Sequence, residues 1–93
     1  MQLGMKSRLN KEYKHRLDEL RIIVNSWNLI PDSPIDEFDS INHLLLSQLY
    51  KGTDEFKIRQ LIHFELTNNY GFSSHQINAQ EMTTEVVNWW NNL

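Results

Sequence analysis

The sequence predicts an all-α fold, a single-domain bundle of about four helices joined by short loops. Three observations predict it. Apolar residues recur at spacings of three and four, prolines and glycines separate these stretches, and no alternating run is long enough to indicate a strand. With 93 residues the chain fits one domain, residues 1–93, and disorder is left open for residues 1–6.

The first helix is expected over Asn10–Trp27, because five apolar residues there form one helical stripe. Pro31 and Pro34 then prevent a continuous helix. The second helix is expected to begin with Ser33 as its N-cap and Pro34 in its first position, and to end near Tyr50. The stripe of the first helix consists of Tyr13, Leu17, Leu20, Val24 and Trp27.

The two later helices have their own start and stop signals. Gly52 is expected to close the second helix in a left-handed conformation. Thr53 or Asp54 is expected to cap the third helix, which ends at the letters "NNYG". Asn78 and Glu81 form a capping-box pattern at the start of the fourth helix. The third stripe consists of Ile58, Leu61, Ile62 and Leu66.

Residue types that could carry catalysis or bind metal occur in two places. Asp36, Asp39 and His43 are expected on one face of the second helix, where they would fit a divalent metal or acid–base chemistry. Carboxylates also favour a helix start for dipole reasons, and this interpretation is preferred. Glu12 and His15 have the spacing of di-iron sites, which require two such pairs. The sequence therefore predicts no enzyme, no catalytic residue, no metal and no cofactor.

Charge is distributed unevenly along the chain. Residues 1–21 carry six bases and three acids, whereas residues 22–50 carry four acids and no base. Two prolines stiffen the acidic part, so that it fits docking to a basic protein, although capping and solubility would also explain it. The candidate partner-binding residues are Asp32, Asp36, Glu37, Asp39 and His43.

The basic first segment also raises the possibility of nucleic-acid binding. The second and third helices would then form a helix-turn-helix. A recognition helix should present basic or amide side chains near its start, whereas the third helix begins with Asp54 and Glu55, which repel phosphate. Three later side chains offset this in part, namely Lys57, Arg59 and Gln60. The alternative is that the basic residues form a solvated face of the first helix.

The letters "IVNSWN", then a proline, then "DEFD", and finally "VVNWW" carry a family resemblance. Residues 17–93 resemble a family of small bacterial helical proteins without an assigned biochemical function. In that family a helix ends in Trp-Asp-Pro, and an acidic-aromatic-acidic motif begins the next helix. Here Asn28 replaces the acid after Trp27, and Leu29 and Ile30 precede Pro31.

Domains of this kind also resemble the immunity proteins of contact-dependent growth inhibition systems. That resemblance implies binding without catalysis, namely neutralisation of a cognate toxin, such as a nuclease that acts on transfer RNA. Trp27 and Phe38 are then expected to anchor the intervening loop while its acids face outward. The alternative is a small helical nucleic-acid-binding regulator or an adaptor protein.

Two further expectations concern location and assembly. The sequence shows no signal peptide and no apolar run long enough to span a membrane, so a cytoplasmic location and no membrane partner are expected. Val87 and Trp90 widen the apolar face of the last helix, which leaves a homodimer open.

Overall fold

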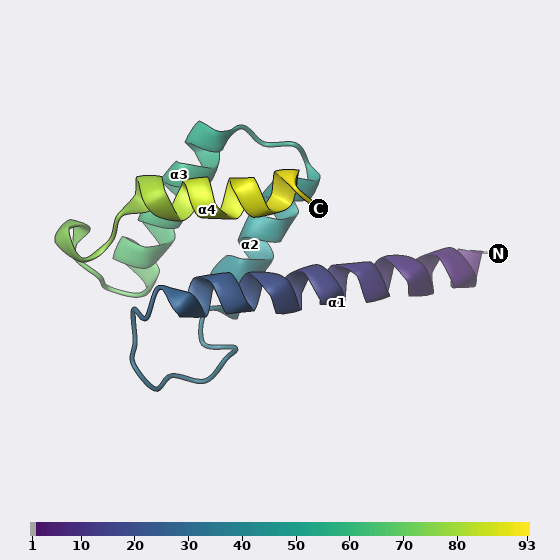
Figure 1. Cartoon of the computed structure of the whole chain (residues 1–93), viewed down its shortest axis with the longest axis horizontal. Coiled ribbons are helices and arrows are strands. Elements are labelled where there is room, and N and C mark those ends of the chain that lie inside the picture. The colour runs from purple at the N-terminus through teal and green to yellow at the C-terminus, as the bar shows by residue number, and fades with distance from the viewer. Residues whose placement is uncertain (1) are drawn as a thin grey trace. The chain divides into compact units, whose positions relative to one another are not determined.

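The computed structural model describes the backbone of residues 2–93 and the side chains of residues 10–93. Its α-helices are α1 (Gln2–Ser26), α2 (Asp39–Tyr50), α3 (Glu55–Phe64) and α4 (Ala79–Asn91) (Figure 1). A π-helical turn, η1 (Glu65–Asn69), continues α3, and a 3-10 turn, η2 (Ser74–Gln76), precedes α4. Within the described residues there is no strand, so the predicted all-α fold class is confirmed.

The chain divides into two compact units, Met1–Asn42 and His43–Leu93. The first unit comprises α1, the connection that follows it and the first residues of α2. The second unit comprises the rest of α2 together with α3, η1, η2 and α4. The expectation of a single domain stays a prediction.

Helix α1 is longer than the predicted Asn10–Trp27, because it begins at Gln2. It includes residues 2–6, for which the sequence left disorder open. Methionine, lysine, arginine and leucine in residues 5–9 are strong helix formers. Their intrinsic propensity favours a helix even where no apolar stripe is present. Three residues of the predicted stripe, Leu17, Leu20 and Val24, are buried.

The predicted start of the second helix is wrong. Helix α2 begins at Asp39, and tight turns precede it, in which the Asp39 amide donates to the Asp36 carbonyl at 3.1 Å. The first helical bond joins the Asn42 amide to the Phe38 carbonyl at 2.9 Å. Phe38 is only 1% exposed. Burial of this ring therefore decides where α2 starts, in preference to the local capping signal at Ser33.

The predicted end of α2 and the predicted starts of α3 and α4 are confirmed, whereas α3 itself ends at Phe64 and only the π-helical turn η1 reaches the letters "NNYG". Gly52 closes α2 with φ +76°. Asp54 is the N-cap of α3, where its carboxylate accepts the Lys57 amide at 2.9 Å. Asn78 is the N-cap of α4, where its side-chain oxygen accepts the Glu81 amide at 3.1 Å. Each of these signals acts within four residues, so the sequence reveals it directly.

Helices α3 and α4 pack on each other within the second unit. Their buried side chains include Ile58 and Ile62 from α3, and Met82 and Val86 from α4. After α3 the helix widens into the π-helical turn η1, where the Tyr70 amide donates to the Glu65 carbonyl at 3.2 Å. The face of α3 turned away from these buried residues forms part of the surface described below.

Candidate protein-binding surfaces

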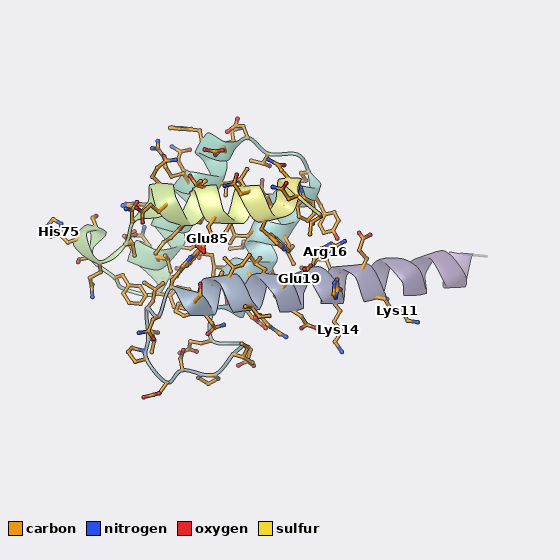
Figure 2. The ribbon with its side chains drawn as sticks, in the orientation of Figure 1. Lys11, Lys14, Arg16, Glu19, His75 and Glu85 are labelled. Carbon is orange, nitrogen blue, oxygen red and sulfur yellow. The ribbon has the colours of Figure 1, made fainter. Side chains whose placement is uncertain are left out.

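The basic residues of α1 divide into solvated and paired side chains. Lys11 and Lys14 are exposed on the helix (Figure 2). Arg16 instead forms an ion pair with Glu19 at 2.9 Å, and Arg21 is engaged by two carboxylates. The side chains of Lys6 and Arg8 lie outside the described residues. Within the described part of α1, the predicted basic face therefore reduces to two exposed lysines.

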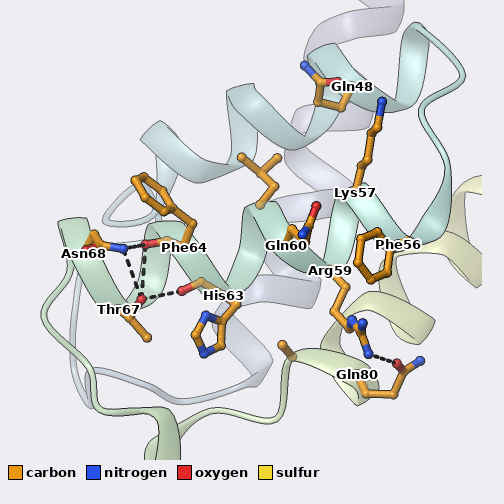
Figure 3. Close-up of a pocket in the computed structure, with 12 residues that line it drawn as sticks. Gln48, Phe56, Lys57, Arg59, Gln60, His63, Phe64, Thr67, Asn68 and Gln80 are labelled. Atoms are coloured by element: carbon orange, nitrogen blue, oxygen red, sulfur yellow. Dashed lines mark hydrogen bonds between the residues drawn. The ribbon is translucent and has the colours of Figure 1, made fainter.

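A groove of about 930 Å³ lies in the second unit (Figure 3). Its walls come mainly from α3 and η1, with Gln48 from α2 and Gln80 from α4. Phe56 and Phe64 both line it, and each is 57% exposed. Solvent exposure of two aromatic rings in one groove is unusual for a surface without a partner.

The groove carries positive charge. Lys57, Arg59 and His63 line it, and no described carboxylate does. Arg59 is held in place, because its guanidinium donates to the Gln80 side-chain oxygen at 3.2 Å and lies 5.1 Å from the centre of the Phe56 ring. Lys57, Arg59 and Gln60, the residues that favoured nucleic-acid binding in the sequence, all face this groove.

Sequence reasoning did not identify the groove, although one signal points to it. Phe56 and Phe64 fall outside the buried stripe of α3 and lie eight residues apart, which places them on one face of a helix. Leu61, expected in the stripe, is only half-buried and lines the groove. The contributions from α2 and α4 depend on tertiary packing, which no local pattern encodes.

The aromatic residues at the end of α4 are partly covered by the second unit itself. Trp90 packs edge-to-face on Tyr50, with ring centres 4.9 Å apart, and tilts against Trp89 at 5.9 Å. Both tryptophans are half-buried. Because Tyr50 covers part of the Trp90 ring, the apolar area left for self-association is smaller than the sequence indicated. The homodimer stays a prediction.

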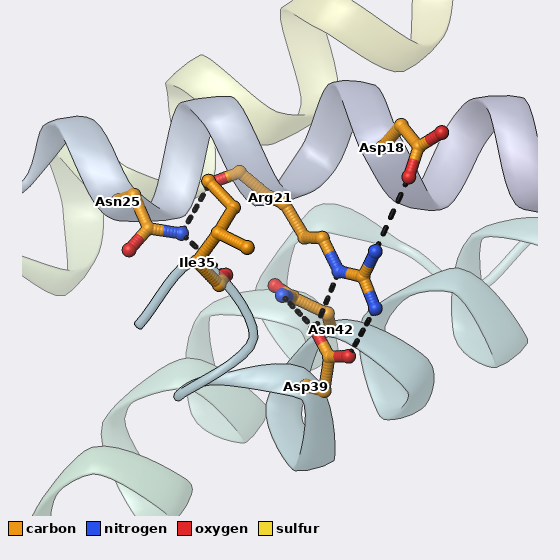
Figure 4. A network of polar contacts seen from close by, with 6 residues as sticks. All are labelled: Asp18, Arg21, Asn25, Ile35, Asp39 and Asn42. Atoms are coloured by element: carbon orange, nitrogen blue, oxygen red, sulfur yellow. Dashed lines mark hydrogen bonds and ion pairs between the residues drawn. The ribbon is translucent and has the colours of Figure 1, made fainter. Parts of the chain in front are cut away.

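The connection between α1 and α2, here called the acidic turn (residues 28–38), has a backbone fixed at several points. Asn28 and Asp32 adopt left-handed conformations, with φ of 52° and 63°. The Asn25 side chain donates to the Ile35 carbonyl at 2.9 Å and to the Arg21 carbonyl at 2.7 Å (Figure 4). Asparagine and aspartate tolerate this conformation better than most residues. The turn is therefore shaped by specific contacts as well as by its prolines.

Arg21 and Asp39 form a bidentate ion pair next to this turn. The guanidinium Nε donates to Oδ1 at 2.9 Å, and Nη2 donates to Oδ2 at 2.5 Å (Figure 4). The side chains are 24% and 23% exposed. The hydrogen bonds that Arg21 donates to Asp39 raise the pKa of Arg21, and burial opposes this shift. Asn42, buried behind the pair, donates to Asp39 at 3.2 Å.

This ion pair corrects the prediction that all four acids of the segment face outward. Asp39 is neutralised by Arg21, which lies 18 positions earlier in the chain. A charge count within the segment does not reveal such a partner. The structure leaves three exposed acids in the acidic turn, Asp32, Asp36 and Glu37. Among them stands Ile35, which is 57% exposed.

The remaining predicted site residues are placed differently from the expectation. His43 is exposed and belongs to the second unit. Asp36 precedes α2, so Asp36, Asp39 and His43 do not form one helical row. His15 lies 3.7 Å from Glu19 instead of completing a site with Glu12. Within the described residues, no three histidine, cysteine or acidic side chains group as metal ligands would.

Tyr13 provides a test of the environment around the ion pair. Burial, and then the charge of Asp39, raise the pKa of Tyr13 above its ordinary value of 10.0. The unfolded chain therefore loses this proton at lower pH than the folded chain. The resulting stabilisation is fully present below about pH 10 and is lost as the pH rises through the folded pKa.

We expect Tyr13 to ionise above the ordinary value in a phenolate absorbance titration of the folded protein. The Tyr13→Phe variant should lack that late transition, and subtracting its titration from that of the intact protein should isolate it. A difference curve centred at or below about pH 10 would contradict the described surroundings of Tyr13.

Comparison of this chain with protein-family models, with curated proteins and with solved structures finds no significant match. Among the described residues, no helix combines the length and the apolar character needed to cross a membrane. The resemblances noted in the sequence stay predictions.

Proposed function

We propose that the protein acts by binding another protein, without catalysis, as a bacterial cytoplasmic immunity protein that neutralises a cognate toxin. The toxin class implied by the sequence resemblance is a contact-dependent growth inhibition nuclease that acts on transfer RNA. The observation that carries the proposal is the acidic turn, in which Asp32, Asp36 and Glu37 are exposed around Ile35. The partner surface is expected to be basic with an apolar recess.

The fixed backbone of the acidic turn supports this proposal energetically. A loop that must become ordered on binding loses affinity, whereas one already held by the Asn25 side chain and by the bond from the Ser33 amide to the Ile30 carbonyl does not. Nucleases that bind RNA have basic substrate surfaces, and an acidic partner is attracted to them during diffusion. Ile35 would then supply the apolar contact at the centre of the acidic rim.

The test is a double charge reversal, Asp36→Lys with Glu37→Lys. Both side chains are exposed, so folding should be preserved. Like charges across the interface should weaken toxin binding by about 100-fold or more and abolish protection of cells that express the toxin. The toxin to be used is the one encoded beside the gene for this protein.

The matched control reverses two exposed acids elsewhere, Glu12→Lys with Glu85→Lys, which changes the net charge equally. This control should keep its affinity and its protection. Full protection by the turn variant would contradict the assignment of the turn, and a gene neighbourhood without a toxin would contradict the immunity function itself.

The nucleic-acid alternative has weaker support. Its favourable residues, Lys57 and Arg59, face the groove, but Glu55 lines a small adjoining cavity together with Phe56 and Arg59. A phosphate backbone crossing this end of α3 would meet that carboxylate. A salt-dependent gel shift of RNA or DNA by the isolated protein would favour the alternative. An adaptor role would be favoured by a partner that is not a toxin.

A further inference from the structure

We infer that the groove in the second unit binds an amphipathic helix of a partner protein, one that presents apolar side chains along one face and carboxylates beside them. This surface shares no residue with the acidic turn and has the opposite charge. The inference therefore goes beyond the proposed neutralisation of a toxin and does not depend on it.

The spacing of the exposed rings fits a helix as the occupant. Phe56 and Phe64 are eight residues apart on α3, which separates them by about 12 Å along the helix axis. Helices that bind in grooves use apolar anchors at positions i, i+3 or i+4, and i+7, which span about 10 Å. A cavity of about 930 Å³ accommodates several such side chains. The two rings would contact the first and last anchors.

The charge of the lining selects the partner's chemistry. Lys57 and Arg59 line the groove with two cationic side chains, and no described carboxylate lines it. The carboxamide groups of Gln48, Gln60 and Gln80 add hydrogen-bond donors. Carboxylates at the edges of an apolar helix face would satisfy these groups, whereas lysines would be repelled.

Arg59 is prepared for such an interaction. It already lies over Phe56 and is tethered by Gln80, so that few side-chain rotations need to be restricted on binding. A carboxylate that reaches Arg59 would therefore sit directly beside an apolar anchor in contact with Phe56. This pairing of an aromatic ring with a fixed cation is typical of residues that dominate binding energy.

The π-helical turn η1 is a second, independent feature of the groove. Thr67 and Asn68 belong to η1 and line the groove wall. The Thr67 hydroxyl donates to the His63 carbonyl at 2.8 Å, and the Asn68 side chain donates to the Phe64 carbonyl at 3.1 Å (Figure 3). Single π-turns are often found at functional sites. Here the turn forms the end of the groove next to Phe64.

The experiment selects displayed random peptides of about 16 residues on the intact protein, with parallel selection on the Phe56→Ala/Phe64→Ala variant. Peptides enriched on the intact protein alone should combine apolar residues at helical spacing with aspartate or glutamate. The strongest selected peptide, labelled with fluorescein, should bind the alanine variant at least about tenfold more weakly. Binding to Lys57→Glu/Arg59→Glu should fall by at least a similar factor.

The matched control is Ile22→Ala/Leu93→Ala, which removes two exposed apolar side chains outside the groove and should retain full binding. The unfolding midpoint of each variant is measured to verify that it is folded. If the alanine variant is unstable, Lys57→Glu/Arg59→Glu still tests whether the peptide binds in the groove. Enriched peptides that are basic, or that bind the groove variants equally well, would overturn the inference. Two further results would also overturn it, because they identify another occupant: binding of a uridine oligonucleotide that requires Phe56 and Phe64, or self-association that requires them.

Discussion

Replacement of Phe38 by alanine is expected to lower the free energy of unfolding by about 3–5 kcal/mol, the usual cost of truncating a buried phenylalanine. The ring is 1% exposed, and the residue stands at the point where the acidic turn meets α2. Its carbonyl also accepts the first helical bond of α2, from the Asn42 amide. The loss is large against a total stability of about 5–15 kcal/mol for a domain.

The change is measured by urea unfolding followed by far-ultraviolet circular dichroism. Phe56→Ala is the matched control, because the same truncation at a ring that is 57% exposed should alter stability by no more than about 0.5 kcal/mol. Equal losses in the two variants would mean that Phe38 is not a core residue. A loss at Phe56 alone would reverse the roles of the two rings.

Reversal of the charge of Asp39, Asp39→Lys, is expected to reduce stability by about 3 kcal/mol. The substitution removes two hydrogen bonds between charged groups and leaves Arg21 facing a like charge where both side chains are about three-quarters buried. Restoring opposite charges with Arg21→Glu in the same chain should recover part of the loss. A double-mutant cycle over the two positions measures this coupling.

Asp36→Lys is the control for Asp39→Lys, because it reverses an exposed acid three positions earlier. It should change stability by about 0.5 kcal/mol or less. If both reversals had the same small effect, Asp39 would belong to the outward-facing acids after all. The distinction matters for the proposed function, since only exposed acids contribute to an interface without damage to the fold.

The pH dependence of this effect has a definite sign. The pKa of Arg21 is raised above its ordinary value by the hydrogen bond to Asp39. The stabilisation linked to Arg21 is therefore fully present below the pKa of arginine in the unfolded chain and is lost only as the pH rises through the higher folded pKa. The difference in stability between the wild type and Asp39→Lys should stay constant between about pH 7 and pH 9. A difference that vanished within this range would require another titrating group.

The sequence by itself determined the all-α fold class and the features whose causes are local. Asp54, one of the two cap candidates for its helix, and Asn78 accept bonds from amides three positions ahead, and Gly52 takes a left-handed conformation that a side chain would oppose. The residues that form each of these signals lie within about one helical turn of one another in the sequence. The buried stripe of α3, at Ile58 and Ile62, was predicted for the same reason, since its period is that of the helix itself.

Only the tertiary structure decided the features that join distant residues. Helix α2 begins at Asp39 because the burial of Phe38 outweighs a local cap at Ser33, whose contribution is only about 1 kcal/mol. Asp39 does not belong to the outward-facing acids, because Arg21, 18 positions earlier in the chain, neutralises it. The groove also required Gln48 from α2 and Gln80 from α4, which only tertiary packing brings to the same groove as Phe56 and Phe64 of α3.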